Sequence, residues 1–131
     1  MTGQERQEIK ARLIELGFWG ADEAGDPAAD RRDALTLYNR AAERLAKGAG
    51  LYSTGLTAIS KSRKIEVKRG GASYRLADGP NFPESICRAA LALPGFLKQH
   101  PECAADRKYA GDIEAYGVEE IACDEGDQED A

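Results

Sequence analysis

The sequence has only one histidine and three cysteines, and it offers no recognisable set of metal ligands. Cys87, Cys103 and Cys123 are an odd number, and no two of them have the Cys-x-x-Cys spacing of zinc sites and redox motifs. We therefore expect reduced thiols and no metal or cofactor. His100 precedes a proline at an expected helix end, and Cys87 lies in an apolar helical stretch without a nearby base, so neither residue predicts catalysis.

Other function classes also lack their sequence signatures. No apolar run approaches the roughly 20 residues that cross a membrane, and no basic start followed by an apolar stretch marks a secretory signal. The glycine-rich loops that cradle phosphates are missing as well. Apolar residues make up 42% of the chain and charged residues 31%, which is typical of a soluble globular protein. Because no secretory signal and no catalytic set of residues is recognisable, we predict a cytoplasmic, non-enzymatic protein.

A chain of 131 residues has the size of one typical domain. We expect a single α+β domain over residues 1–122. Residues 123–131 hold five acidic side chains and no basic one, so they predict a solvated tail.

Two helices are predicted in the N-terminal part of the chain. The first begins at the capping box Thr2-x-x-Glu5 and ends at Gly17, and its apolar stripe is Ile9, Leu13 and Leu16. Phe18 and Trp19 should fold back over that stripe; the alternative is an exposed Trp19 that anchors a partner.

The second helix should begin at Asp26-Pro27, run to about Lys47 and lie antiparallel to the first. Its predicted buried stripe is Leu35, Tyr38, Ala42 and Leu45. Four arginines should decorate its solvent side: Arg31, Arg32, Arg40 and Arg44.

A β-hairpin is predicted around Gly70-Gly71. Counting outward from this turn pairs Val67 with Tyr74, Glu66 with Arg75, and Ile65 with Leu76. The register gives one apolar and one polar face, as expected for a half-buried antiparallel sheet. Residues 51–60 could add an edge strand.

A third helix should begin after Asn81, which forms a cap with Glu84, and should break at Pro94-Gly95. The predicted core is Ile65, Val67, Tyr74, Leu76, Ile86 and Leu93. A short helix over residues 104–110 and an extended segment over 113–121 would follow. The expected architecture is α+β, with two N-terminal helices, a small antiparallel sheet that contains the Gly-Gly hairpin, and a third helix packed on the sheet.

Two segments resemble known families. Residues 82–91, Phe-Pro-Glu-Ser-Ile-Cys-Arg-Ala-Ala-Leu after a short hairpin, resemble the helix entry of small bacteriophage and prophage accessory proteins, including the phage ABA-sandwich proteins. This resemblance implies a phage origin and brings no catalytic motif. The N-terminal half resembles peptidoglycan-binding modules through Leu16-Gly17-Phe18, Gly25, Ala34-Leu35 and Tyr38-Asn39, which implies cell-wall binding as an alternative function.

The strongest functional signal is segregated charge. Between residues 61 and 75, basic side chains are opposed by Glu66 alone. Together with Trp19, they form the predicted partner-binding set: Lys61, Arg63, Lys64, Lys68, Arg69 and Arg75. Such a surface could bind an acidic partner, while the acidic tail could imitate nucleic-acid phosphates.

We therefore expect a phage or prophage accessory protein that binds a host or phage protein, such as an anti-CRISPR-like inhibitor of a bacterial defence system. Nucleic-acid binding through the same basic residues is a further alternative, although a net charge of −5 disfavours it. An unpaired edge of so small a sheet would favour a homodimer.

Overall fold

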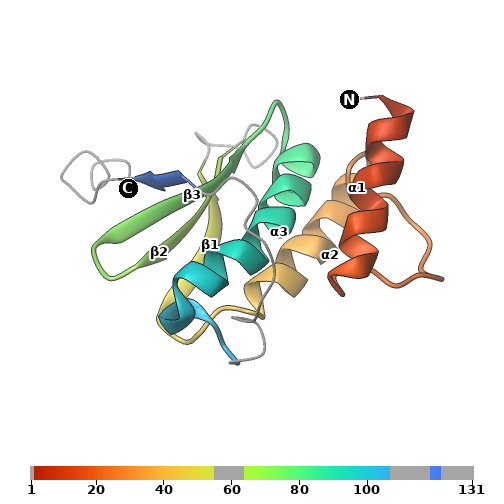
Figure 1. The fold of residues 1–131 in the computed structure, drawn as a ribbon. Coiled ribbons are helices and arrows are strands. Elements are labelled where there is room, and N and C mark those ends of the chain that lie inside the picture. Colours follow the sequence, from red (N-terminus) through yellow and green to blue (C-terminus); the bar gives the residue numbers. More distant parts are fainter. Residues whose placement is uncertain (1, 55–63, 107–118, 122–131) are drawn as a thin grey trace.

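Figure 1 shows the computed structural model of the chain, which describes residues 2–54, 64–106 and 119–121. The described elements follow in the order α1 (Gly3–Glu15), α2 (Arg31–Ala42), β1 (Ala49–Thr54), β2 (Lys64–Arg69), β3 (Ala72–Asp78), α3 (Phe82–Gln99), the 3-10 helix η2 (Pro101–Cys103) and β4 (Glu119–Ile121). Helix α3 lies between the sheet and the other two helices. The predicted α+β class is confirmed.

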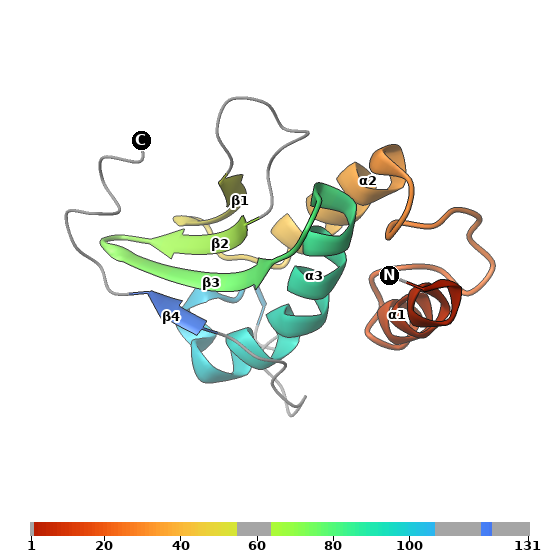
Figure 2. The same cartoon turned by 90° about the horizontal axis from the view of Figure 1, so that it is seen from above.

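The 18-residue helix α3 packs against the sheet on one side and against α1 and α2 on the other (Figure 2). Asn81 caps it as predicted, because its side chain accepts a hydrogen bond from the Glu84 backbone N–H. The predicted break at Pro94-Gly95 is wrong: the helix continues to Gln99. Proline removes one backbone hydrogen bond there, but both residues are buried, and the surrounding packing holds the helix together.

Helix α1 begins and ends as predicted. Thr2 and Glu5 form the capping box through reciprocal hydrogen bonds between side chain and backbone. Gly17 follows the helix with a φ of +83°, a conformation that favours glycine. Ile9 and Leu13 are buried, and α1 packs mainly on α3.

Helix α2 is shorter than predicted. Of its predicted buried stripe, Leu45 is buried and Tyr38 and Ala42 are partly buried against the core, but Leu35 is not buried. Asp30 is its cap, because the Asp30 carboxylate accepts backbone hydrogen bonds from the first turn; the predicted start at Asp26-Pro27 belongs to a preceding turn. Leu35 is 40% exposed. The buried residues of the helix are Ala34, Leu37 and Ala41. Both stripes have helical spacing, and the small alanines of the observed one allow α2 to approach α3 closely.

The sheet has the order β1-β2-β3-β4 and is antiparallel throughout. Two predicted register pairs are confirmed, Val67 with Tyr74 and Glu66 with Arg75. The predicted pairing of Ile65 with Leu76 is wrong, because a bulge leaves Leu76 without a register partner and Ile65 pairs with Ala77. Both Leu76 and Ala77 are buried, so the extra residue adds an apolar side chain to the core.

The segments around the hairpin agree in part with the predictions. Strand β1 supplies an edge strand at residues 51–54, and β4 an extended segment at 119–121. Residues 104–106 are not helical; Ala104 instead bridges to Leu45. The other parts of these predictions lie outside the described residues: 55–60, 107–110 and 113–118. So does the predicted acidic tail, residues 123–131.

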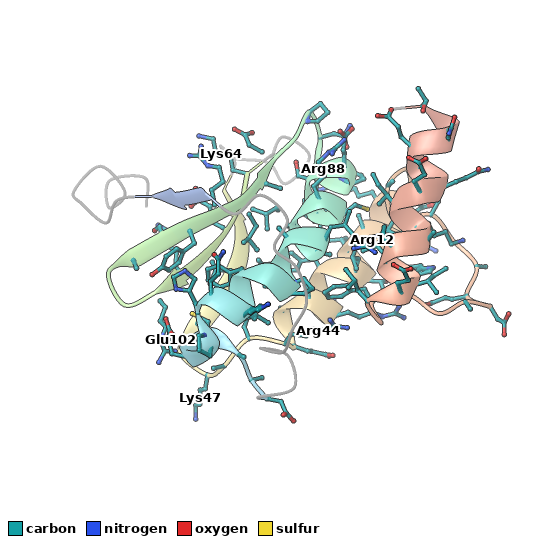
Figure 3. All side chains as sticks on the ribbon, in the orientation of Figure 1. Arg12, Arg44, Lys47, Lys64, Arg88 and Glu102 are labelled. Carbon is teal, nitrogen blue, oxygen red and sulfur yellow. The ribbon has the colours of Figure 1, made fainter. Side chains whose placement is uncertain are left out.

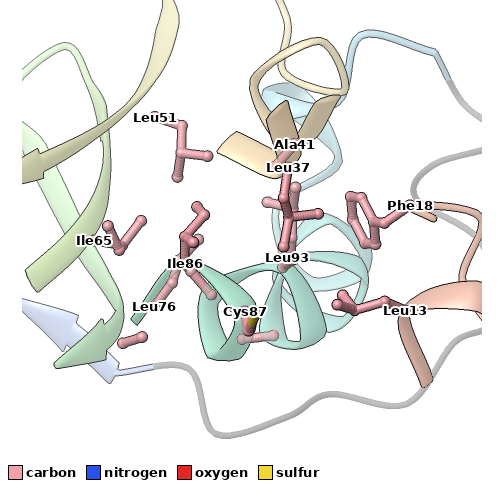
Figure 4. Packing of buried hydrophobic residues seen from close by; sticks show 14 of the residues in the cluster. Leu13, Phe18, Leu37, Ala41, Leu51, Ile65, Leu76, Ile86, Cys87 and Leu93 are labelled. Carbon is pink, nitrogen blue, oxygen red and sulfur yellow. The ribbon is translucent and has the colours of Figure 1, made fainter. Parts of the chain in front are cut away.

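One hydrophobic cluster joins the helices to the sheet (Figure 4). Leu13 and Phe18 approach α3 from the α1 side, and Leu51 and Ile65 approach it from the sheet. Every residue of the predicted core belongs to this cluster, with Tyr74 partly buried against it. The core therefore fixes the position of the hairpin relative to α3.

Candidate binding surfaces

The structure divides the predicted basic hairpin between two sides of the sheet. Val67 is fully buried, and the ring of Tyr74 lies 5.1 Å from that of Phe96, so these strand positions face α3. Side chains alternate along a strand, which puts the intervening positions on the opposite side, here called the outer face. The described basic residues of the outer face are Lys64, Lys68 and Arg75. Lys61 and Arg63 lie outside the described residues.

Glu66 lies in the middle of the outer face. Its carboxylate is 3.8 Å from Nε of Arg75, and the residue is only 8% exposed. The two side chains are neighbours across β2 and β3, so their opposite charges support the register of the hairpin. Residues 64–75 contain four basic residues and one acidic residue, and the hairpin therefore retains a surplus of three positive charges.

Arg69 is separated from the other basic residues of the hairpin. Arg69 is two residues after Val67, so it is on the same face of β2 as Val67, but it lies beyond the edge of the core. Its guanidinium approaches Gly48, and its positive charge favours a lower pKa of the Cys103 thiol, against the larger effect of burial. Lys47 is near that end of the sheet, whereas Lys64 is at the opposite end (Figure 3). The structure therefore brings three of the predicted binding residues onto one face and places Arg69 elsewhere.

Trp19 is not an exposed anchor. It is 4% exposed and Phe18 is 1% exposed, so the alternative in which Trp19 reaches for a partner is wrong. The guanidinium of Arg40 lies 4.8 Å from the centre of the Trp19 ring, and that of Arg44 lies 3.7 Å from the Phe18 ring. These contacts explain why the two aromatic side chains fold back after α1, as the main prediction stated.

Arg40 also holds the loop between α1 and α2. Its guanidinium donates hydrogen bonds of 2.8 and 2.7 Å to the Glu23 carboxylate and a further one to the Phe18 carbonyl. The hydrogen bonds from Arg40 are the main reason why the pKa of Glu23 falls to about 2. Arg44 likewise donates to the Leu16 carbonyl. Two arginines expected to face solvent therefore have structural contacts.

The two described thiols are poorly suited to nucleophilic chemistry. Cys87 is fully buried in α3, and burial raises the pKa of its thiol to about 12. Cys103 is also buried, which raises the pKa of its thiol. A thiol that stays protonated is a weak nucleophile.

His100 is explained by its neighbours. It ends α3 and stacks on Phe96 with ring centres 4.8 Å apart, and its Nδ1 lies 3.5 Å from the Glu102 carboxylate. Over residues 2–54, 64–106 and 119–121, no group of three or more histidine, cysteine or acidic side chains is placed to hold a metal ion.

A polar cavity of about 450 Å³ opens where the three helices meet. Its walls come from α1, from the start of α2 and from the start of α3: Arg6, Ala28, Ala29, Arg31, Asn81, Phe82, Pro83 and Glu84. Sequence reasoning missed this feature. Its two arginines are 25 positions apart and the third wall comes from residues 81–84, about 50 positions after Arg31, so no local pattern connects them.

Comparison with models of known protein families, with characterised proteins and with solved structures found no match to this chain. None of the helices in the described part of the chain combines the length and hydropathy needed to cross a membrane.

Proposed function

We propose that the protein works without catalysis, by binding an acidic macromolecular partner through the outer face of β2 and β3, and that this partner is a host or phage protein. The observation that carries the proposal is the placement of three basic residues, Lys64, Lys68 and Arg75, against the single acidic Glu66 among residues 64–75 of this face, in a chain whose net charge is −5. A local basic surface on an acidic protein attracts and orients an acidic partner, and it repels basic ones.

The geometry of the hairpin suits this role. Lys64 and Lys68 occupy the same face of β2, roughly 13 Å apart along the strand, and both are partly exposed. The buried residues Ile65 and Val67 hold the same strand against α3. Charges carried by a strand that is packed on its other side keep a fixed spacing, which favours selection of one acidic surface over another.

For the biological role, we propose a phage or prophage accessory protein that inhibits a bacterial defence system, in the manner of an anti-CRISPR protein. Two features support this role. Residues 82–91 resemble phage accessory proteins, and the described surface carries a basic face but no recognised catalytic group. The described thiols are buried and His100 is stacked on Phe96, so these residues favour a binding function over a catalytic one.

The test compares Lys64→Glu with Arg32→Glu, which reverses an equal charge on the exposed side of α2. Tagged wild-type protein is used to capture partners from a lysate of the bacterial host. We expect one stoichiometric protein that is released by salt, is captured equally by Arg32→Glu and is lost with Lys64→Glu. Equal capture by both variants, or no partner in repeated captures, would contradict binding through the outer face.

The same basic side chains give nucleic-acid binding as the competing outcome. A protein that neutralises phosphates loses affinity steeply as salt rises, so a gel-shift titration at several salt concentrations detects this mode. If the captured material disappears after nuclease treatment, and duplex or single-stranded probes shift at low salt, the partner is a nucleic acid and the protein-partner proposal fails.

A further inference from the structure

We propose that the cavity at the meeting point of the three helices binds the oxyanion of a small ligand, either a phosphate or a carboxylate group. Its volume of about 450 Å³ lies within the range of small-molecule sites. The site is built by the helices and does not include the outer face of the sheet, so it goes beyond the proposed function and stands independently of it.

Two arginines supply the positive charge of the cavity. Arg31 forms no ion pair with a described residue; its guanidinium lies 5.6 Å from the centre of the Phe82 ring. Arg6 has one acidic neighbour, Asp26, at 4.0 Å, the outer limit for an ion pair. Both guanidinium groups therefore retain hydrogen-bonding capacity for a ligand, and their planar donor geometry matches the paired oxygens of phosphate and carboxylate.

The nearby carboxylates are occupied by donors from the protein itself. Glu84, the acidic residue in the wall of the cavity, is 8% exposed and lies 3.0 Å from the guanidinium of Arg88. Asp33 accepts a hydrogen bond of 2.9 Å from the Asp26 backbone N–H, and Asp30 caps α2. Among the residues that line the cavity, Arg6 and Arg31 are the cationic donors, and the charge of Glu84 is balanced by Arg88.

Two other wall residues contribute to the site: Phe82 packs beneath Arg31, and Asn81 offers a neutral donor. Phe82 is 2% exposed and lies against Tyr38, with ring centres 6.3 Å apart, so the surface beneath Arg31 is fixed. The side-chain oxygen of Asn81 accepts a hydrogen bond from the Glu84 backbone N–H, which leaves the Asn81 amide group able to donate. An oxyanion held between these donors would bridge α1 and α2.

The experiment is an NMR titration of the ¹⁵N-labelled full chain with sodium phosphate, sodium succinate and, at matched ionic strength, sodium chloride. We expect saturable chemical-shift changes at residues 28–31 and 81–84 with phosphate, succinate or both. Because each arginine contributes charged hydrogen bonds, Arg31→Gln and Arg6→Gln should each weaken binding roughly tenfold. Arg32→Gln, which alters the next residue of α2 outside the cavity, should bind as the wild type does.

The thermal midpoint gives a second readout, because a ligand that binds only the folded state stabilises it by an amount that grows with the logarithm of the ligand concentration above the dissociation constant. Saturation by phosphate alone identifies a phosphoryl ligand, and saturation by succinate alone identifies a carboxylate. Shifts that match those of sodium chloride, or equal binding by Arg31→Gln and Arg32→Gln, would overturn the site. Lys64→Glu should leave phosphate binding unchanged. Failure of this proposal can therefore be distinguished from failure of the proposal that the outer face binds a partner.

Discussion

Single residues of α2 determine how the chain turns after α1. The side chains of Arg40 and Arg44 are long enough for their guanidinium groups to lie over the rings of Trp19 and Phe18 and also to donate hydrogen bonds to a carboxylate and backbone carbonyls. A helical-wheel argument assigns such arginines to solvent because it considers charge and not length. The indole N–H of Trp19 has no hydrogen-bond partner among the described residues, so this tryptophan stabilises by packing.

We predict that Trp19→Ala destabilises the protein by about 3 kcal/mol, the usual cost of removing a buried aromatic side chain. Under conditions in which the variant is folded, it should capture the partner as the wild type does. Urea unfolding measures the first effect and capture under native conditions the second. A stable variant that has lost its partner would show that Trp19 is a binding residue after all.

Glu23 should give the protein an acid-dependent loss of stability. Its pKa in the folded protein is about 2, below its ordinary value of 4.5, so the unfolded chain takes up the proton first as the pH falls. The stabilisation is therefore complete above about pH 4.5 and disappears between pH 4.5 and pH 2. We predict that Glu23→Gln lowers the urea midpoint at pH 6 and has little effect at pH 2.

The control for this prediction is the same substitution made in an Arg40→Gln background. Because Arg40 is the main cause of the low pKa and the Gly20 backbone N–H a smaller one, removing Arg40 should shrink most of the difference between the pH profiles with and without Glu23→Gln. An undiminished difference would show that Arg40 is not the main cause of the acid sensitivity.

At the scale of elements, the face that α2 buries can be tested by a matched pair of substitutions. Leu37 is fully buried and Leu35 is 40% exposed, although they lie two residues apart on one helix. We predict that Leu37→Ala costs about 3 kcal/mol of unfolding free energy and Leu35→Ala less than about 0.5 kcal/mol. Chemical unfolding of both variants measures the difference, and a larger cost for Leu35→Ala would restore the stripe expected from the sequence.

Three element ends could be predicted from adjacent residues. The capping box of α1, the Asn81 cap of α3 and the Gly70-Gly71 turn each need only a few neighbouring positions, and all three occur as expected. The start of α2 at Asp30 is also local but was missed, because Asp26-Pro27 offers a competing cap. Two other unpredicted features depend on distant contacts. The continuation of α3 through Pro94 requires burial on both sides, and the bulge at Leu76 requires room in the core.

At the scale of the whole molecule, α3 joins the two candidate surfaces. It supports the sheet that carries the outer face, and its first turn forms one wall of the cavity. The outer face could be foreseen because its lysines are close together in the sequence. The cavity could not, because Arg6, Arg31 and Asn81 come from three separate segments and meet only after folding.

The salt dependence of partner binding decides whether the outer face is the functional surface. Dissociation constants for the captured partner are to be measured at several salt concentrations with wild type, Lys64→Glu and Arg32→Glu. We predict a loss of roughly tenfold or more for Lys64→Glu at low salt, shrinking as salt screens the surface charges, and wild-type binding by Arg32→Glu. Equal affinities for the two variants at every salt concentration would contradict binding through β2 and β3.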